Sequence, residues 1–291
     1  MGKFFLPSWL KNHLFTYNNI NDVSQDKIDR IKEGLNRLKS DTPDVSIVIP
    51  VWNEENNILR TLSSISEIRT NYECELILVN NNSTDDTQGV IDFLGVRSVF
   101  EKEQGIAHAR TAGLKAARGK YHLCADADTF YPPKWVDAMV EVLKEENVVC
   151  VYGKYSFVPP ENTKRFGLAI YESISEILFL LRKRGHEYIN VLGFNFGFIT
   201  ELGRNIDGFR MEKSRKGENI KGSSDYVQAS EDGMMAMRIS EFGKIKRVKS
   251  EKARAWTGTR RLLKDGSLAK AFKNRVKTQS GRLLEYIKGK K

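Results

Sequence analysis

Short apolar runs alternate with stretches of helical period along the first half of the chain. The run Val45–Val51 is almost continuously apolar, which favours a strand buried on both faces of a parallel sheet. After it, Ile58, Leu62 and Ile65 recur at the spacing of one helix face. The strand-like runs are residues 45–51, 75–79, 97–100, 121–124 and 148–152. Strands that alternate with helices in this way predict an α/β fold: an open, mostly parallel, Rossmann-like sheet with helices on both faces.

Polar clusters follow three of the predicted strands directly. They are Trp52–Glu54, Asn80–Asp86 and Asp126–Asp128. Because parallel strands end at one edge of a sheet, and such sheets bind ligands there, we expect the clusters to lie close together. Asn53 is also expected to cap the first helix, and Ser83 or Thr84 the second.

Two carboxylates stand directly after the strand 121–124. Side chains alternate along a strand, so Asp126 and Asp128 are expected to share one face. Carboxylates so close repel each other unless a cation joins them, and a hard divalent ion such as Mn²⁺ or Mg²⁺ fits oxygen ligands best. Two solvated aspartates in a loop remain the alternative reading of this motif taken alone.

The second half of the chain has a different pattern. Residues 166–181 form a helical stripe of Phe166, Ile170, Ile174, Ile177, Leu178 and Leu181. We expect that stripe to pack into the core, with a groove for a lipid-like acceptor as the alternative. Residues 193–199 are expected to form a strand near the site, where glycines allow close approach. A polar stretch at 210–230 is typical of a lid loop, and a helix follows Ser230, Glu231 and Asp232.

Charge is concentrated at the C-terminal end. The chain of 291 residues has 47 Lys and Arg against 37 Asp and Glu, a net charge of +10. Residues 244–291 contain 17 Lys and Arg and 3 Asp and Glu, so the remainder is slightly acidic. Such a tail predicts a nearby anionic surface, either lipid or nucleic acid. We divide the chain into an N-terminal helical appendage (1–43), a first half (44–155), a second half (156–258) and a basic amphipathic helical tail (259–291).

The three cysteines, Cys74, Cys124 and Cys150, have no metal-binding spacing. They are therefore expected to be buried free thiols in a reducing compartment. No stretch of about 18 uncharged apolar residues predicts a membrane span. We expect a cytoplasmic protein. Peripheral attachment to the inner face of the cell membrane through the basic tail is an alternative that stays open.

Six motifs occur together in one order between about residues 45 and 260. They are "VSIVIPVWNEENNI", "VNNNSTDDT", "GIAHARTAGLKAARGKY", "ADADTFYPPKW", "GFNFGFITELGRNIDGF" and "SED" before a helix. In this order the chain resembles the inverting glycosyltransferases of family 2, which have the GT-A fold. That resemblance implies a nucleotide-sugar donor, UDP- or GDP-linked, a glycan or lipid-linked acceptor, and Mn²⁺ or Mg²⁺ as cofactor.

The same resemblance implies a role for individual residues. It assigns metal binding to Asp128, with Asp126 at the ribose or the outer metal shell. It assigns the catalytic base to Asp232, with Glu231 beside it. The residues that it places around the nucleotide are Pro50, Val51, Asn53, Glu54, Asn80, Asn82, Arg110 and Asp126.

Two departures from the family pattern matter. Asn80 stands where an acidic residue is usual, which leaves the choice between UDP and GDP open. The second departure is Thr111, which replaces a frequent Asn. In addition, residues 256–261 are only reminiscent of the tryptophan motif of processive members, which favours addition of a single sugar. One alternative is a nucleotidyltransferase, which the acidic turn Trp52–Glu55 disfavours. The other is a non-catalytic basic protein that binds nucleic acid. The sequence has no recognition motif for nucleic acid, so we expect no nucleic-acid partner.

Overall fold

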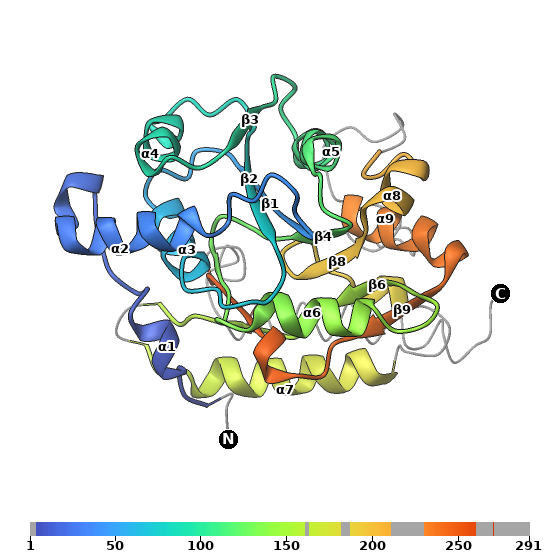
Figure 1. Ribbon diagram of the computed structural model, residues 1–291. Helices are drawn as coiled ribbons and strands as arrows, with labels where there is room; N and C mark the ends of the chain where they lie inside the picture. The colour runs from blue at the N-terminus through green and yellow to red at the C-terminus, as the bar shows by residue number, and fades with distance from the viewer. Residues whose placement is uncertain (1–3, 161–162, 182–186, 211–229, 260–269, 271–291) are drawn as a thin grey trace.

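A seven-stranded sheet forms the centre of the computed structural model (Figure 1). The structure describes residues 4–160, 163–181, 187–210, 230–259 and 270, without the side chains of 178–181. The strands of this sheet are β1 (Val45–Val51), β2 (Cys74–Asn80), β3 (Ser98–Phe100), β4 (Tyr121–Cys124), β6 (Val148–Tyr152), β8 (Phe196–Ile199) and β9 (Lys244–Arg247). Their order is β3-β2-β1-β4-β8-β6-β9, and only β8 runs against its neighbours. The predicted open, mostly parallel sheet is confirmed.

Helices cover both faces of this sheet. The helices of the described chain are α1 (Ser8–Lys11), α2 (Gln25–Asn36), α3 (Ile58–Ile65), α4 (Thr87–Leu94), α5 (Ile106–Ala116), α6 (Trp135–Leu143), α7 (Phe166–Leu181), α8 (Thr200–Asn205) and α9 (Glu231–Ile239). Of these, α1 and α7 pack against a second, smaller sheet. Short 3₁₀ turns are η1 (Ile20–Asp22), η2 (Glu187–Asn190), η4 (Ser240–Phe242) and η5 (Glu251–Ala253). All seven residues of β1 are buried: Ile47 and Ile49 pack with α2, α3 and α6, whereas Val48 packs with α5 on the other face. The prediction that this apolar run forms a strand buried on both faces is therefore confirmed.

A smaller sheet joins the two halves of the chain. Its strands are β5 (Thr129–Phe130), β10 (Ala255–Thr257) and β7 (Tyr155–Phe157), in that order. Leu10 of α1 packs against Phe130 and Trp256 of this sheet. The N-terminal segment is thus held on the sheet that follows the Asp126–Asp128 turn.

The predicted core packing of the stripe on α7 is wrong. Phe166, Ile170 and Ile177 are exposed, whereas Tyr171 and Glu172 face inward. The side chains of Leu178 and Leu181 lie outside the description, as does most of the 210–230 loop. All three cysteines are buried and free, as expected. In the described part of the chain, no helix is both long and apolar enough to cross a bilayer.

Candidate active site

One edge of the large sheet collects the polar turns. Strands β1, β2 and β4 are parallel, so their carboxyl ends lie at the same edge. Strand β8 is antiparallel to β4, so the segment Gly193–Asn195 just before it reaches that edge as well. The predicted convergence is confirmed, and the second half of the chain contributes to it.

The first two turns are bonded to each other. Asn53 has a φ of 53°, and its backbone N–H donates to Ser83 Oγ at 3.1 Å. Its Oδ1 accepts the backbone N–H of Thr84 at 2.8 Å. The capping predictions are therefore wrong: Asn57 precedes α3 and Asp86 precedes α4. The polar side chains form hydrogen bonds between the two turns instead of capping the helices.

Asn80 uses its amide within the protein. Its Oδ1 accepts the backbone N–H of Ser83 at 3.0 Å, and its Nδ2 donates to Gln88 Oε1 at 2.8 Å. The side chain is buried at the end of β2. Each amide group retains a further bonding position, since the oxygen has two lone pairs and the nitrogen two hydrogens. A base that reached Asn80 would therefore meet an amide whose orientation is already fixed.

The other residues assigned to the nucleotide differ in exposure. Pro50 and Val51 are buried in β1, and the Val51 carbonyl accepts the N–H of Asn81 at 2.9 Å. Glu54 is half-buried and accepts from Asn57 Nδ2 at 2.7 Å. Asn82 is exposed, with a φ of 58°. Asn53 and Asn82 are therefore accessible to a ligand, whereas Pro50 and Val51 are buried at the end of β1.

Asp126 and Asp128 lie in a turn rather than in a strand. Strand β4 ends at Cys124, so the strand alternation predicted for the two carboxylates does not apply. The backbone N–H of Asp126 donates to the Tyr131 hydroxyl at 2.9 Å, which bends the chain away from the sheet. The Asp128 carbonyl accepts the N–H of Gly258 at 3.2 Å. The Asp128 side chain lines a cavity of about 500 Å³ next to the small sheet.

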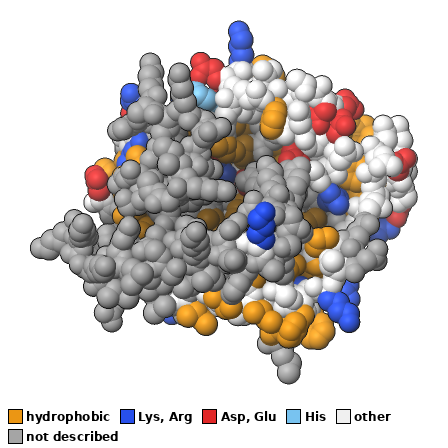
Figure 2. Space-filling view, turned by 180° about the vertical axis from the view of Figure 1, so that it is seen from behind, with side chains coloured by type: hydrophobic (Ala, Val, Ile, Leu, Met, Phe, Trp, Pro, Cys, Tyr) orange, Lys and Arg blue, Asp and Glu red, His pale blue; other side chains and the backbone are white. Residues whose placement is uncertain are grey.

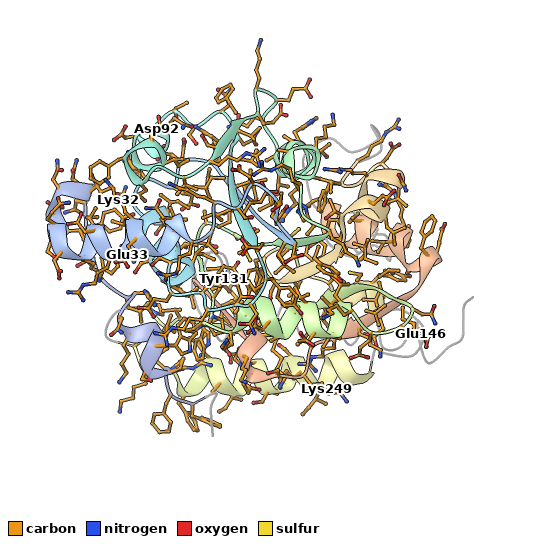
Figure 3. The ribbon with its side chains drawn as sticks, in the orientation of Figure 1. Lys32, Glu33, Asp92, Tyr131, Glu146 and Lys249 are labelled. Atoms are coloured by element: carbon orange, nitrogen blue, oxygen red, sulfur yellow. The ribbon has the colours of Figure 1, made fainter. Side chains whose placement is uncertain are left out.

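Tyr131 is a positioning residue that sequence analysis missed. Its hydroxyl also donates to the Phe194 carbonyl at 2.8 Å, so one atom joins the Asp126 turn to the segment before β8. Figure 3 shows Tyr131 near the middle of the molecule, far from surface residues such as Lys32 and Lys249. Burial, with Asp126 adding to it, raises the pKa of Tyr131 well above its usual value, so the phenol keeps its proton. Only its place in the motif "ADADTFYPPKW" pointed to it.

Arg110 lies at the centre of the carboxylates. Its Nη2 is 2.9 Å from Asp126 Oδ1, and its Nε is 3.5 Å from Glu231 Oε1. The Arg110 side chain is only 3% exposed. Burial alone would lower the pKa of Arg110, but Asp126, Glu231 and Asp232 together raise it above its ordinary value. A permanent cation therefore links the turn after β4 to the start of α9.

Glu231 and Asp232 open α9, as predicted. Asp232 is buried; its Oδ2 accepts the backbone N–H of Gly193 at 2.6 Å and its Oδ1 that of Gly233 at 2.7 Å. Burial raises the pKa of Glu231 and Asp232 adds to this, while Arg110 opposes it. The two carboxylates thus differ: Asp232 is held by two N–H donors, whereas Glu231 is easier to protonate than an ordinary glutamate.

Gly193 allows this packing. A Cβ atom built at Gly193 would lie 2.4 Å from Arg110 Nη2 and 3.4 Å from Asp232 Oδ2. No larger residue fits unless Arg110 moves. The close approach that the glycines of this segment predicted is thereby confirmed at a specific contact.

His108 is exposed on α5 and pairs with Glu103 at 3.1 Å. The basic tail lies outside the described residues beyond Thr259, except for Lys270.

The family model "Glycosyl transferase family 2" matches residues 46–203, more than half of the chain. The chain belongs to glycosyl transferase family 2. The matched range includes β1, the Asp126–Asp128 turn and Gly193, and it ends before Glu231 and Asp232. The described residues form a glycosyltransferase domain, and its structural neighbours have the GT-A fold.

Relatives and solved structures agree with this assignment. The hyaluronan synthase of Pasteurella multocida is 27% identical over 237 residues, which cover 78% of this chain and 22% of that protein. S. aureus TarS has a TM-score of 0.55 at 18% identity, covering 74% of this chain and 60% of the other. The mannosyltransferase PcManGT of Pyrobaculum calidifontis, solved with GDP-Man and Mn²⁺, has a TM-score of 0.54 at 20% identity, covering 91% and 71%. The chain spans about a fifth of the length of the first curated relatives it matches.

Proposed function

We propose that this protein is a metal-dependent, inverting glycosyltransferase that moves one sugar from a nucleotide-sugar donor to a hydroxyl of a glycan or a lipid-linked acceptor. The observation that carries the proposal is the buried contact of Arg110 with Asp126 at 2.9 Å and with Glu231 at 3.5 Å. It unites the end of a parallel strand, where ligands bind in such sheets, with a pair of carboxylates suited to proton transfer.

The donor is proposed to lie over the turns that follow β1 and β2. TarS has been solved with UDP-GlcNAc, and PcManGT with GDP-Man and Mn²⁺, and both share this fold. We place the base and ribose at Asn53, Asn80 and Asn82, with Asp126 toward the ribose. Asn80 can both donate and accept, so it suits either uracil or guanine.

The oxygen atoms present fit Mn²⁺ or Mg²⁺. Asp126 already faces Arg110, whereas Asp128 lies in the same turn and lines a cavity, so we assign the direct metal contact to Asp128. Among the described residues there is no cluster of three or more His, Cys, Asp or Glu side chains that could hold a metal. Such ions are commonly held by one or two carboxylates together with substrate phosphates and water. When bound, the cation would offset negative charge on the leaving diphosphate.

The acceptor hydroxyl is a weak nucleophile with a high pKa, and a carboxylate must take its proton as it attacks. We assign this role to Asp232, with Glu231 beside it. The N–H groups of Gly193 and Gly233 hold the Asp232 carboxylate in one orientation, and each oxygen keeps a lone pair for the proton. Asp232 stands in the first turn of α9, where a carboxylate interacts favourably with the helix dipole. The bond from sugar C1 to the diphosphate breaks as the new bond forms on the opposite face, which inverts the configuration.

A thermal-shift panel of nucleotides and nucleotide sugars, with and without Mn²⁺, tests the donor assignment. A ligand that binds the folded state raises the unfolding temperature by mass action. We expect at least one UDP- or GDP-sugar to do so, with a larger shift when Mn²⁺ is present. Asp128→Ala should abolish the Mn²⁺-dependent part, whereas Asp29→Ala on exposed α2 should not change it. If no nucleotide sugar shifts the wild type, the proposed function is wrong.

A further inference from the structure

Helix α7 turns its apolar side outward. Phe166, Ile170 and Ile177 are 63%, 42% and 57% exposed. At 100° per residue they lie within about 40° of one another around the helix, so they form one stripe. Figure 2 shows hydrophobic side chains gathered along the lower edge of the molecule, the edge along which α7 runs in Figure 1. Large apolar side chains aligned in this way mark a surface that another apolar phase covers.

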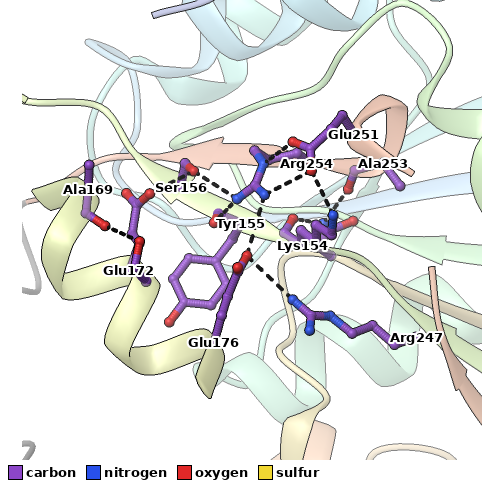
Figure 4. A network of polar contacts seen from close by, with 12 residues as sticks. Lys154, Tyr155, Ser156, Ala169, Glu172, Glu176, Arg247, Glu251, Ala253 and Arg254 are labelled. Carbon is purple, nitrogen blue, oxygen red and sulfur yellow. Dashed lines mark hydrogen bonds and ion pairs between the residues drawn. The ribbon is translucent and has the colours of Figure 1, made fainter. Parts of the chain in front are cut away.

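The inner side of α7 carries charged as well as apolar side chains. Leu168 and Tyr171 are buried against Phe157 of β7. Glu172 is 2% exposed; its Oε2 is 2.7 Å from Arg165 Nη2 and accepts from Ser156 Oγ at 2.9 Å. One turn further on, Glu176 Oε1 is 3.4 Å from both Arg247 and Arg254 (Figure 4). Both carboxylates of the helix therefore point inward, Glu172 toward the small sheet and Glu176 toward Arg254 and Arg247 of β9.

An ordinary surface helix exposes its charges and buries its large apolar side chains. Helix α7 instead turns both of its carboxylates inward and leaves three large apolar side chains exposed, in addition to those that it buries. Burial of Glu172 and Arg165 carries a desolvation penalty. The exposed apolar stripe is favourable when the outer side of the helix meets an apolar medium.

The N-terminal segment extends the same surface. Phe4 and Phe5 are 42% and 75% exposed, and the Phe4 ring centroid is 5.9 Å from that of Phe166. We call Phe4, Phe5, Phe166, Ile170 and Ile177 the α7 face. We propose that the α7 face inserts into the headgroup and acyl boundary of a bilayer that contains anionic lipid, and so attaches the protein peripherally.

The charge of the sequence around α7 and in the tail favours an anionic bilayer as the partner of the α7 face. Lys164 is exposed just before α7, and Arg182, Lys183 and Arg184 follow the helix directly in the sequence. Residues 244–291 contain 17 Lys and Arg and 3 Asp and Glu. A symmetric dimer through this face would bring like charges together, because each copy presents the same patch. Anionic headgroups instead attract the cations while the acyl chains receive the apolar side chains.

Vesicle co-sedimentation of the full chain tests the proposal. The vesicles are phosphatidylcholine with and without added phosphatidylglycerol. The wild type should sediment with the anionic vesicles. The double variant Phe166→Ser, Ile177→Ser should partition at least about tenfold less, because two inserted apolar side chains are lost.

A matched control keeps the loss interpretable. Phe100→Ser with Phe242→Ser removes side chains that are 62% and 54% exposed on β3 and η4, away from α7. This control should partition like the wild type. Because all four side chains are exposed, both variants should fold.

Three results would overturn the proposal. The wild type fails to bind anionic vesicles, or the α7 variant binds as well as the wild type. Alternatively, the wild type is a dimer in size-exclusion chromatography, the α7 variant is a monomer and neither binds vesicles, which would make the face a protein interface. None of these results bears on donor binding, so the failure of this proposal and that of the proposed function are distinguishable.

Discussion

Gly193→Ala should destabilise the protein although it adds only one methyl group. The added Cβ would lie 2.4 Å from Arg110 Nη2, so the guanidinium must move. Arg110 is 3% exposed and holds Asp126 at 2.9 Å, so it has no free space to move into without losing that contact. Overpacking costs about 1–3 kcal/mol and the loss of a charged hydrogen bond about 1.5–3 kcal/mol, so we expect about 2.5–6 kcal/mol in total.

Urea unfolding followed by tryptophan fluorescence measures this effect, with Gly258→Ala as the control. Gly258 lies beside the same site, but a Cβ there would meet only the Asp128 carbonyl oxygen at 3.9 Å. The control should therefore lie within about 0.5 kcal/mol of the wild type. Equal midpoints for the two variants would refute the close packing of Arg110 between Gly193 and Asp126.

Two further substitutions test buried ionisable side chains. His122 is buried on β4 and stacks on Phe198, and burial lowers its pKa to about 3 from 6.5. The unfolded chain therefore takes up a proton first as pH falls below 6.5, and by pH 5.5 the wild type should lose about 1 kcal/mol of stability relative to His122→Leu. Parallel stability curves would contradict this. Glu172→Gln leaves Arg165 buried without its charged partner and should cost about 3–5 kcal/mol in urea unfolding. An unchanged midpoint would show that this pair does not hold α7 on the small sheet.

Much of the fold could be predicted from the sequence because it depends on local patterns. The apolar run of β1 is buried on both faces, and the polar turns that follow β1, β2 and β4 meet at one edge. Burial on both faces requires a continuous apolar run, so the pattern has few other meanings.

Other features depend on contacts between distant segments. The turn that holds Asp126 is fixed by Tyr131, whose hydroxyl also reaches Phe194, and no periodicity marks that link. The central position of Arg110 arises from three elements that are far apart in the chain. The apolar stripe Phe166, Ile170 and Ile177 of α7 faces outward, while Glu172 is buried in an ion pair with Arg165. A hydrophobic pattern shows that a helix has two sides, but not which side faces the core.

The role of Asp232 is the most direct test of the proposed chemistry. Consumption of the nucleotide sugar found in the thermal-shift panel would be measured for the wild type, Asp232→Asn and Asp207→Asn, the last an exposed aspartate that pairs with Arg210. Asp232→Asn should bind the donor with unchanged affinity and consume it about 10²- to 10⁴-fold more slowly, the range expected when a general base is lost. Asp207→Asn should behave like the wild type. Normal consumption by Asp232→Asn would contradict the proposed site.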